Sequence, residues 1–434
     1  MSTPSLDDTQ VLNLVRQVEL AQSAGQRDQA ERLLTTARTA APEHPLVLNA
    51  SGVQELHKGN FAGARALIER AIAKDAGNAA FWINLASTLR RLGLRDEEMQ
   101  ALQKALTIEP RHLLALLQKA SLQDLMGQTR AAAKTYHNAL QTIPANAQLP
   151  ESLREPLRHA VRTVQENTSR LEAFLGERLQ GVGDGHSPAE RERYELCFDA
   201  HLGKRRIYTP QPTFLQFPQL PALEFYPHEM FPWLAQIEAA SDEIRAEFER
   251  IFAEDAGLLE PYVKHPEGVP LDQWKELNHS RRWSVLYLWR DGKPEAANIA
   301  RCPRTAELMK SVPKVDIPEV GPAVFFSVLD AKSHIPAHTG VTNTRLVVHI
   351  PLIIPEGCRF RVGSTTRPWL EGEALVFDDS IEHEAWNDSD VPRAVLIFDI
   401  WNPFLTPLER DVVRKMVSGI REYYGSASPL SESN

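Results

Sequence analysis

The chain has 434 residues, of which 43% are hydrophobic and 24% are charged, and its formal net charge is −9 at pH 7. Such a length favours two or three domains, and the composition is that of an ordinary globular chain. The acidic balance argues against a general nucleic-acid binder, which would show a basic face, and no apolar run approaches the roughly 18 residues that indicate a membrane span.

The N-terminal residues and the cysteines predict a cytoplasmic location. The segment MSTPSLDDTQ has no basic stretch followed by an apolar core, so no secretory signal is expected. The three cysteines, at positions 197, 302 and 358, are far apart and form no CxxC pair. Free thiols in a reducing compartment are therefore expected in place of a disulfide framework.

Landmarks in the first third of the chain recur at a fixed interval of 34 residues. A period of this length is typical of the tetratricopeptide repeat, a helix–turn–helix unit. Glycine ends the first helix where a positive φ is needed, alanine lets the paired helices approach, and proline breaks the second helix. The landmarks are Gly25, Gly59, Gly93 and Gly127, Ala37, Ala71, Ala105 and Ala139, and Pro42, Pro110 and Pro144.

The period predicts four repeat units, at about 9–42, 43–76, 77–110 and 111–144. A further helix near 151–178 would cap the open end of the stack, which needs a polar outer face. Residues 1–178 are thus predicted to form an all-α tetratricopeptide-repeat solenoid. Such arrays present a groove, so a protein partner in this groove is possible, or the array braces its neighbour.

A linker and an extended segment are predicted next. Residues 179–194 include GVGDGHSPAERE, whose glycines and polar residues favour a linker. The segment TPQPTFLQFPQLPALEFYP, at 209–227, is too rich in proline for a helix. We expect it to lie in extended form on a second domain that covers 195–434.

Short apolar runs predict a β-domain from about residue 283. The runs WSVLYLW, AVFFSVL, RLVVHIPLIIP, CRFRVG, EALVFDD and RAVLIFDIW are separated by turn residues. Several short strands at regular spacing favour an antiparallel sandwich or barrel over alternating strands and helices. Helical patterns before and after them predict flanking helices, so the chain as a whole is expected to be an α+β multidomain protein.

Histidines and arginines stand at the ends of several of these runs. A lone histidine is more often a core or surface residue than a metal ligand. Several histidines close to arginines on one small β-scaffold favour a metal site more strongly, and imidazole suits Fe, Zn, Cu and Ni. The residues are His334, His338, Arg345, His349, His383 and Arg393.

The stretch from about 325 to 403 resembles the aspartyl/asparaginyl β-hydroxylase family. The resemblance is carried by the ordered motifs H-T-G-x-T-N, H-x-P-L, F-D-D-S-x-x-H-E-x-W and D-x-W-x-P, which are all present here. The family implies an oxygenase that depends on Fe(II) and 2-oxoglutarate, built on a double-stranded β-helix or jelly roll. Family members commonly carry tetratricopeptide repeats upstream, as this chain does.

The resemblance implies a role for each matching residue. His338 and His383 correspond to the two iron ligands. Arg393 corresponds to the arginine that pairs with the distal carboxylate of 2-oxoglutarate, and Ser327 to its hydroxyl helper. Trp283 corresponds to a tryptophan that lines the cosubstrate pocket.

Further matches concern the metal-binding end of the cosubstrate and the substrate. His349 corresponds to a histidine near that end, and Arg345 to an arginine that faces substrate or cosubstrate. Where animal members of the family have a second arginine, this chain has Val347. Gly340 takes the place where most such oxygenases have a carboxylate ligand.

The acidic residues around His383 have two interpretations. Asp378 and Asp379 are expected to orient ligands or water near the metal, with Asp379 the catalytically important one, although one of them could itself be a third ligand. Glu382 and Glu384 are expected to be solvated. We favour a site with two histidines and no carboxylate.

The predicted function is a dioxygenase that hydroxylates a carbon of an aspartyl/asparaginyl-like or other peptide or small-molecule substrate and releases succinate and CO2. One alternative is a non-catalytic repeat scaffold with a degenerate jelly roll that binds a protein partner. Another is a metal-dependent isomerase or dioxygenase of the cupin kind, which would not need Arg393 as a carboxylate anchor. No nucleic acid and no membrane span are expected.

Overall fold

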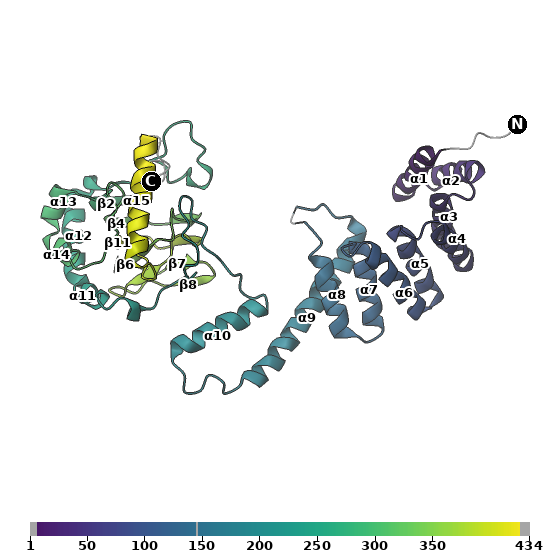
Figure 1. Cartoon of the computed structure of the whole chain (residues 1–434), viewed down its shortest axis with the longest axis horizontal. Coiled ribbons are helices and arrows are strands. Elements are labelled where there is room, and N and C mark those ends of the chain that lie inside the picture. The colour runs from purple at the N-terminus through teal and green to yellow at the C-terminus, as the bar shows by residue number, and fades with distance from the viewer. Residues whose placement is uncertain (1–6, 145, 426–434) are drawn as a thin grey trace. The chain divides into compact units, whose positions relative to one another are not determined.

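The computed structural model describes residues 7–144 and 146–425, and it divides the chain into two compact units, Met1–Arg191 and Glu192–Asn434 (Figure 1). The parts of the predicted domains that fall on residues 1–6, 145 and 426–434 lie outside the described residues. We call the two parts the repeat unit and the β unit.

The repeat unit consists of helix pairs, as the period predicts. The four glycines at the 34-residue spacing have φ of 70°, 83°, 76° and 71°, so each adopts the left-handed conformation that glycine tolerates. A long helix follows the fourth pair at the position predicted for the cap. The helices are α1 Asp8–Ser23, α2 Arg27–Ala40, α3 Pro45–His57, α4 Phe61–Lys74, α5 Ala79–Leu92, α6 Arg95–Ile108, α7 Leu113–Leu125, α8 Thr129–Leu140 and α9 Arg154–Leu179.

The repeat core depends on small residues at the predicted alanine positions. Ala37, Ala71, Ala105 and Ala139 are all 0% exposed, which places them at the closest approach of paired helices. Close packing of this kind leaves no room for a larger side chain. The tetratricopeptide-repeat solenoid is therefore confirmed.

The predicted linker is shorter than residues 179–194. Irregular turns occupy only 180–187, because α10 begins at Pro188 and runs to His201. The Ser187 hydroxyl accepts a hydrogen bond from the Glu190 N–H (3.3 Å), and the Glu190 carboxylate accepts one from the Ser187 N–H (3.0 Å). This reciprocal cap starts the helix, so the last residues of the predicted linker are helical and not irregular.

Two antiparallel sheets form the β unit. The larger sheet has the order β1-β2-β4-β11-β6-β9, with β3 paired to β2, and the smaller has the order β5-β10-β7-β8. The larger sheet contains β1 Glu260–Pro261, β2 Trp283–Arg290, β3 Lys293–Pro294, β4 Val324–Leu329, β6 Arg345–Ile353, β9 Leu375–Phe377 and β11 Arg393–Trp401. The smaller contains β5 Ser333–His338, β7 Cys358–Val362, β8 Thr365–Arg367 and β10 His383–Asn387.

From β4 to β11 the chain passes back and forth between the sheets, with β7 and β8 both in the smaller one. The larger sheet receives β4, β6, β9 and β11, and the smaller receives β5, β7, β8 and β10. This alternation is the winding of the expected double-stranded β-helix. It brings residues that are far apart in sequence onto facing surfaces of the two sheets.

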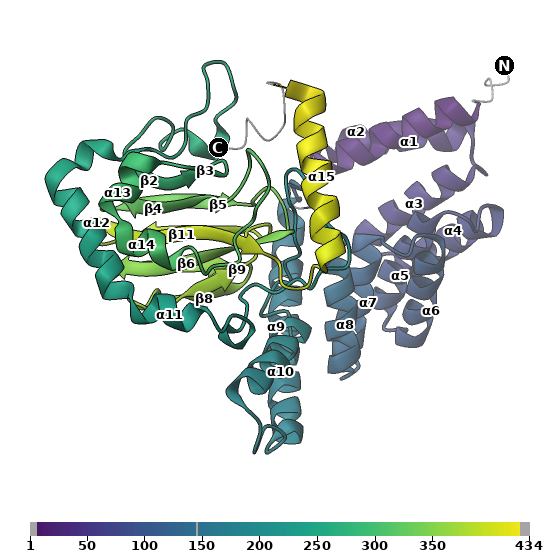
Figure 2. The ribbon, with the colours of Figure 1, turned by 60° about the vertical axis from the view of Figure 1, so that its left-hand side comes forward.

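Helices cover the outer face of the larger sheet (Figure 2). Ile244, Phe248 and Ile251 of α12 (Ser241–Asp255) belong to one buried cluster with Phe326 and Val348 of the sheet. The neighbouring helices are α11 Leu234–Ala239, α13 Ala296–Arg301 and α14 Pro303–Leu308, and α15 Pro407–Tyr424 follows the last strand. Since the outer face is closed, the opposite face of the sheet is the one available for a site.

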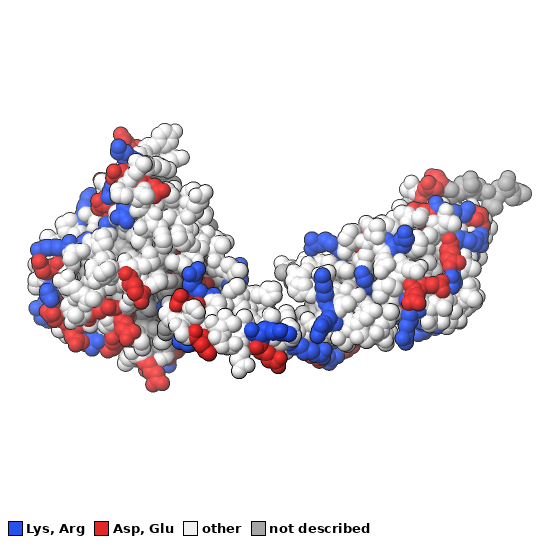
Figure 3. Space-filling model, turned by 60° about the horizontal axis from the view of Figure 1, so that its bottom comes forward, with Lys and Arg blue, Asp and Glu red and all other residues white. Residues whose placement is uncertain are grey.

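Three further observations concern the cysteines, the helices and the surface charge. All three cysteines are free. No helix in the described part of the chain combines the length and apolar character that crossing a bilayer requires. Acidic and basic side chains lie among one another on each unit in the space-filling view (Figure 3).

Candidate active site

The two sheets of the β unit enclose a cavity of about 560 Å³. Side chains from both sheets and from the loops between them line it. Of the residues singled out from the sequence, His334 and Asp378 do not lie on its wall, whereas eight others do: Trp283, Ser327, His338, Arg345, His349, Asp379, His383 and Arg393. The winding of the strands thus gathers residues that are more than a hundred positions apart.

The two predicted metal ligands are neighbours on adjacent strands. His338 ends β5 and His383 begins β10, and their Cα atoms are cross-strand partners. Their ring centroids are 4.1 Å apart. The pairing register shifts between His383 and Ala385, an irregularity of the kind that redirects a side chain at a strand end.

In each of the two imidazoles, one ring nitrogen is hydrogen-bonded to a backbone carbonyl. His338 Nδ1 lies 2.7 Å from the Pro336 carbonyl oxygen, and His383 Nδ1 lies 3.0 Å from that of Ile381. A carbonyl oxygen can only accept, so both Nδ1 atoms donate and the lone pairs reside on Nε2. This is the arrangement in which a neutral histidine binds a metal.

Burial keeps both rings neutral at physiological pH. It lowers the pKa of His338 to about 3, with the neighbouring His383 adding to the shift. It likewise lowers the pKa of His383 to about 4. A metal ion would therefore not have to displace protons from either ring near neutral pH.

Arg393 is a buried cation without an acidic partner among the residues that the structure describes. It begins β11 and is 1% exposed. Its Nε and Nη1 atoms have no hydrogen-bond partner, and its guanidinium lies 4.5 Å from the centre of the Trp369 ring. Burial lowers the pKa of Arg393 to about 10, so it still carries its charge at pH 7.

A hydroxyl and an indole stand close to Arg393 on the same face of the larger sheet. The Trp283 Nε1–H donates to Ser327 Oγ at 3.0 Å. Because this bond occupies an acceptor position of the hydroxyl, the Ser327 proton remains free to be donated. Trp283 and Leu329 are cross-strand partners, and so are Leu329 and Arg393, which brings β2, β4 and β11 into register here.

His349 adds a neutral polar group to the same cavity. It is 7% exposed, and its Nδ1 has no partner in the described structure. Burial, followed by the charge of Arg393, lowers the pKa of His349 well below its usual value. The phenyl rings of Phe360 and Phe377 lie 5.1 Å and 4.9 Å from its ring centre.

Arg345 is shared between two carboxylates. Its Nη2 is 3.6 Å from Asp379 and its Nη1 is 3.3 Å from Asp399. Burial opposes the charge of Arg345, but the two aspartates raise its pKa overall. Val347, the next residue on the same face of β6, adds no charge.

Gly340 leaves room for the carboxylate of Asp379. A Cβ at position 340 would lie 2.1 Å from Asp379 Oδ2, so any side chain there would displace the aspartate. The Gly340 N–H also donates to the Asp379 carbonyl at 2.6 Å. Among the described residues, no group of three or more His, Cys, Asp or Glu side chains is arranged to hold a metal ion, and Asp379 forms no such group with the two histidines.

The other acidic residues near His383 lie in two different environments. Asp378 is 1% exposed and accepts from the N–H (2.9 Å) and hydroxyl (2.6 Å) of Ser380. Glu382 and Glu384 are not simply solvated as predicted, because Arg361 binds them at 2.8 Å and 2.5 Å. This ion-pair cluster forms because Arg361 and Glu384 are cross-strand partners on β7 and β10.

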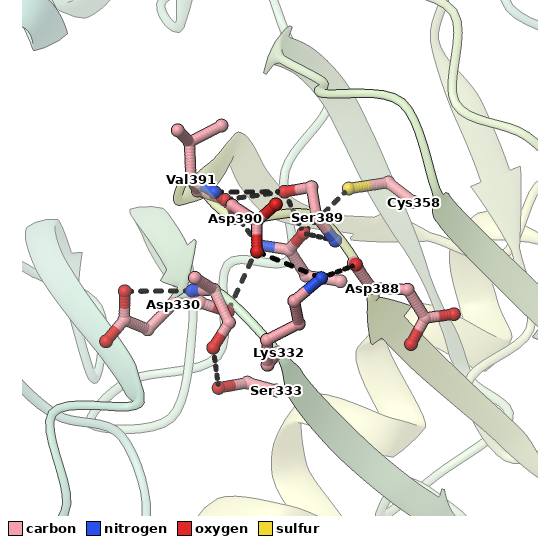
Figure 4. A network of polar contacts seen from close by, with 10 residues as sticks. Asp330, Lys332, Ser333, Cys358, Asp388, Ser389, Asp390 and Val391 are labelled. Carbon is pink, nitrogen blue, oxygen red and sulfur yellow. Dashed lines mark hydrogen bonds and ion pairs between the residues drawn. The ribbon is translucent and has the colours of Figure 1, made fainter.

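Asn387 was not recognised from the sequence. It is 0% exposed, and its Nδ2 donates to the carbonyls of Leu329, Asp330 and Val391 at 2.8–3.1 Å. Its Oδ1 accepts from Ser389 and from Cys358, whose side chains Figure 4 shows pointing into the same turn. The amide therefore fixes the turn between the strand of His383 and the strand of Arg393. In the sequence, this role is indicated only by an asparagine that stands just before an acidic turn.

Comparison with known proteins defines the class of the β unit. Residues 238–403 match the family model described as aspartyl/asparaginyl beta-hydroxylase, and residues 15–79 and 55–112 match that of the tetratricopeptide repeat. The β unit therefore contains a region that matches the aspartyl/asparaginyl β-hydroxylase model, and the repeat unit contains a region that matches the tetratricopeptide-repeat model.

Individual relatives cover different parts of the chain. The mouse aspartyl/asparaginyl beta-hydroxylase is 28% identical over 66% of this chain and 39% of its own length. The ornithine lipid ester-linked acyl 2-hydroxylase of Rhizobium tropici is 33% identical over 44% of this chain and 66% of its own. This chain thus spans less than two thirds of the length of these curated relatives.

Proposed function

We propose that the β unit is an Fe(II)- and 2-oxoglutarate-dependent dioxygenase that hydroxylates a carbon atom of its substrate and releases succinate and CO2. The observation that carries this proposal is Arg393. A fully buried guanidinium without an acidic partner is costly unless a ligand supplies the opposite charge. It stands in the same cavity as two neutral imidazoles whose lone pairs reside on Nε2, so the cavity suits an anion at Arg393 and a metal ion at the histidines.

His338 and His383 would hold the iron. Both are neutral, both are oriented through Nδ1, and both present Nε2, which is the donor set that imidazole offers to a first-row metal. Two protein ligands would leave room at the metal for the cosubstrate and dioxygen. When bound, the iron supplies the activation of dioxygen that carbon hydroxylation requires.

Arg393 and Ser327 would bind the distal carboxylate of 2-oxoglutarate. A guanidinium offers two parallel donors that match a carboxylate, and the free Ser327 proton adds a third. Trp283 orients that hydroxyl and forms part of the pocket wall. The neutral His349 would contact the cosubstrate nearer its metal-binding end without adding charge there.

Asp379 and Arg345 would act at the substrate side of the metal. Asp379 takes the space that a ligating side chain at position 340 would need, and its Oδ1 has no partner in the described structure. It is placed to accept a hydrogen bond from water or another ligand near the two imidazoles. Arg345 fixes that carboxylate and contributes a donor to the substrate end.

The substrate is proposed as a peptide or a small molecule. Relatives named for aspartyl/asparaginyl and for acyl hydroxylation support both kinds as candidates. The repeat unit supports a protein interaction, because stacked helix pairs present a groove. The alternative of a non-catalytic scaffold is disfavoured by the joint presence of His338, His383 and Arg393 on one cavity wall.

Turnover of 2-oxoglutarate tests the proposal directly. The full chain is incubated with Fe(II), dioxygen and 2-oxoglutarate labelled at C1, without added substrate. The labelled CO2 and the unlabelled succinate are then measured. Binding of 2-oxoglutarate is measured separately by calorimetry with Mn(II) under anaerobic conditions. Slow CO2 release together with metal-dependent binding is expected, and the absence of both would overturn the proposal.

A further inference from the structure

A proline-rich segment outside the matched domain touches the candidate metal site. We call residues 209–217, Thr-Pro-Gln-Pro-Thr-Phe-Leu-Gln-Phe, the arm. Proline fixes φ and keeps the residue before it extended, so this segment is stiff before it meets any partner. The arm precedes residues 238–403, the range that matches the hydroxylase family.

The arm is bound through its main chain. The Gln211 N–H donates to the Ser380 carbonyl at 2.7 Å, and the Thr213 N–H donates to that of Gly340 at 3.0 Å. The N–H groups of Phe214 and Leu215 both donate to Val341 at 3.0 Å. Pro210 precedes the first of these donors and Pro212 lies between the first two, so neither proline stands where an N–H is used.

These acceptors belong to the two loops that carry the candidate metal ligands. Residues 339–344 follow His338 directly, and residues 378–382 lead directly into His383. Both loops lack extended strand structure, and one bond joins them, from the Gly340 N–H to the Asp379 carbonyl. The arm binds both loops and so adds a second connection between them.

Burial makes the connection at Ser380 the stronger of the two. Ser380 is 0% exposed, so its carbonyl would have no access to water if the Gln211 N–H were lost. Gly340 is only half-buried, so water could partly replace the Thr213 donor. Thr213 and Phe214 also line the cavity itself.

We propose that the arm is a positioning segment of the active site, which holds the two histidine-bearing loops at the spacing that the metal requires. This inference rests on the proposed function, since it assumes a metal at His338 and His383. With two protein ligands instead of three, the relative placement of the two imidazoles depends more on the loops beside them. The arm acts through those loops and touches no reacting atom.

Proline substitution in the full chain removes one arm N–H at a time. In Gln211→Pro the Ser380 carbonyl loses its donor, and in Thr213→Pro the Gly340 carbonyl does. Gln211→Ala is the matched control that keeps the N–H. Thr209→Pro is the second control, since Thr209 is exposed and its N–H has no partner among the described residues.

Co(II) with 2-oxoglutarate serves as the probe, because its visible absorption reports the coordination geometry as well as the affinity. We expect Gln211→Pro to weaken Co(II) binding about threefold to tenfold, the loss that one buried hydrogen bond explains, and to alter the spectrum. A smaller change is expected for Thr213→Pro. Both controls should match the wild type in affinity and spectrum.

Circular dichroism and thermal unfolding of the metal-free proteins separate positioning from general loss of fold. If Gln211→Pro does not fold, Thr213→Pro decides, because the Gly340 carbonyl that it leaves without a donor is only half-buried. Folded proline variants that bind Co(II) with wild-type affinity and spectrum would overturn the role of the arm. A wild-type protein that binds no Co(II) would instead overturn the proposed function itself.

Discussion

The two ends of the cavity satisfy their buried polar groups in opposite ways. At the histidine end, each ring has one nitrogen bound to a backbone carbonyl and the other left open. At the arginine end, Arg393 has two buried nitrogens without any partner, and Trp369 only stacks on its face. The first end is pre-oriented for a cation and the second lacks an anion. A metal ion at the histidines and a dicarboxylate would complete both ends together. The dicarboxylate would bind the metal at one end and place its other carboxylate at Arg393.

The largest effect should follow from losing one histidine. His383→Ala leaves a single protein ligand, so we expect Fe(II) binding to be weakened strongly and succinate formation to be abolished, and His338→Ala to do the same. Metal content after dialysis and labelled CO2 release are the measurements. His334→Ala is the control, because His334 lies on β5 with His338 but is exposed and stacks on Trp386 at 5.0 Å. Normal turnover in either ligand variant would break the assignment of the histidine end.

Loss of the arginine should weaken only the opposite end. Arg393→Ala removes a charge-assisted contact that is worth about 1.5–3 kcal/mol, so the KM for 2-oxoglutarate should rise about tenfold or more while Fe(II) binding is retained. Arg393→Lys should recover part of the loss, since it restores charge without the planar pair of donors. Arg359→Ala, at an arginine that is half exposed and stacks on Trp386, should leave KM unchanged. An unchanged KM in Arg393→Ala would contradict the anchor role.

A second contrast, between the repeat unit and the β unit, explains which parts of the molecule could be predicted. The repeat unit is built from contacts between neighbouring segments, so the spacing of glycines and alanines was enough to locate its helices. The apolar strands of the larger sheet were also visible as runs. β5 and β10, which carry both candidate ligands, were not, because SHIPAH and HEAWN alternate polar residues and contain no apolar run.

The surroundings of the site depend on contacts that sequence order does not show. The sequence pointed to eight residues that the structure gathers on the wall of one cavity. It did not indicate that Asn387 ties three carbonyls together, that Arg361 binds Glu382 and Glu384, or that the arm binds the ligand loops. Each of these contacts joins segments whose proximity arises only when the strands have been wound.

Asp379 offers a finer test of the histidine end. If it orients water or another ligand, Asp379→Ala should lower the rate of succinate formation several-fold and leave the bound Fe(II) in place. If it were a direct ligand, the variant would lose metal as His383→Ala does. Metal content and rate are therefore measured on the same preparation, with Asp388→Ala on the exposed turn as the control. Loss of metal would show that the histidine end has three protein ligands.

The smallest effect on catalysis, but a distinct one on stability, is expected at Asp378. Burial raises the pKa of Asp378 to about 7, whereas an aspartate in the unfolded chain titrates near about 3.9. Between these values the folded protein holds a proton that the unfolded chain has released, so this residue makes the free energy of unfolding fall as pH rises from about 4 to about 7. Asp378→Asn removes this dependence and keeps the acceptor that Ser380 uses. The stability of the variant relative to wild type should therefore increase across this window and level off above pH 7, whatever constant offset the amide adds.

Denaturant unfolding of the metal-free protein at several pH values measures this difference, with Asp388→Asn as the exposed control. A difference that does not vary with pH would mean that Asp378 is already ionised in the folded state, and that the histidine end carries one more negative charge than its burial suggests.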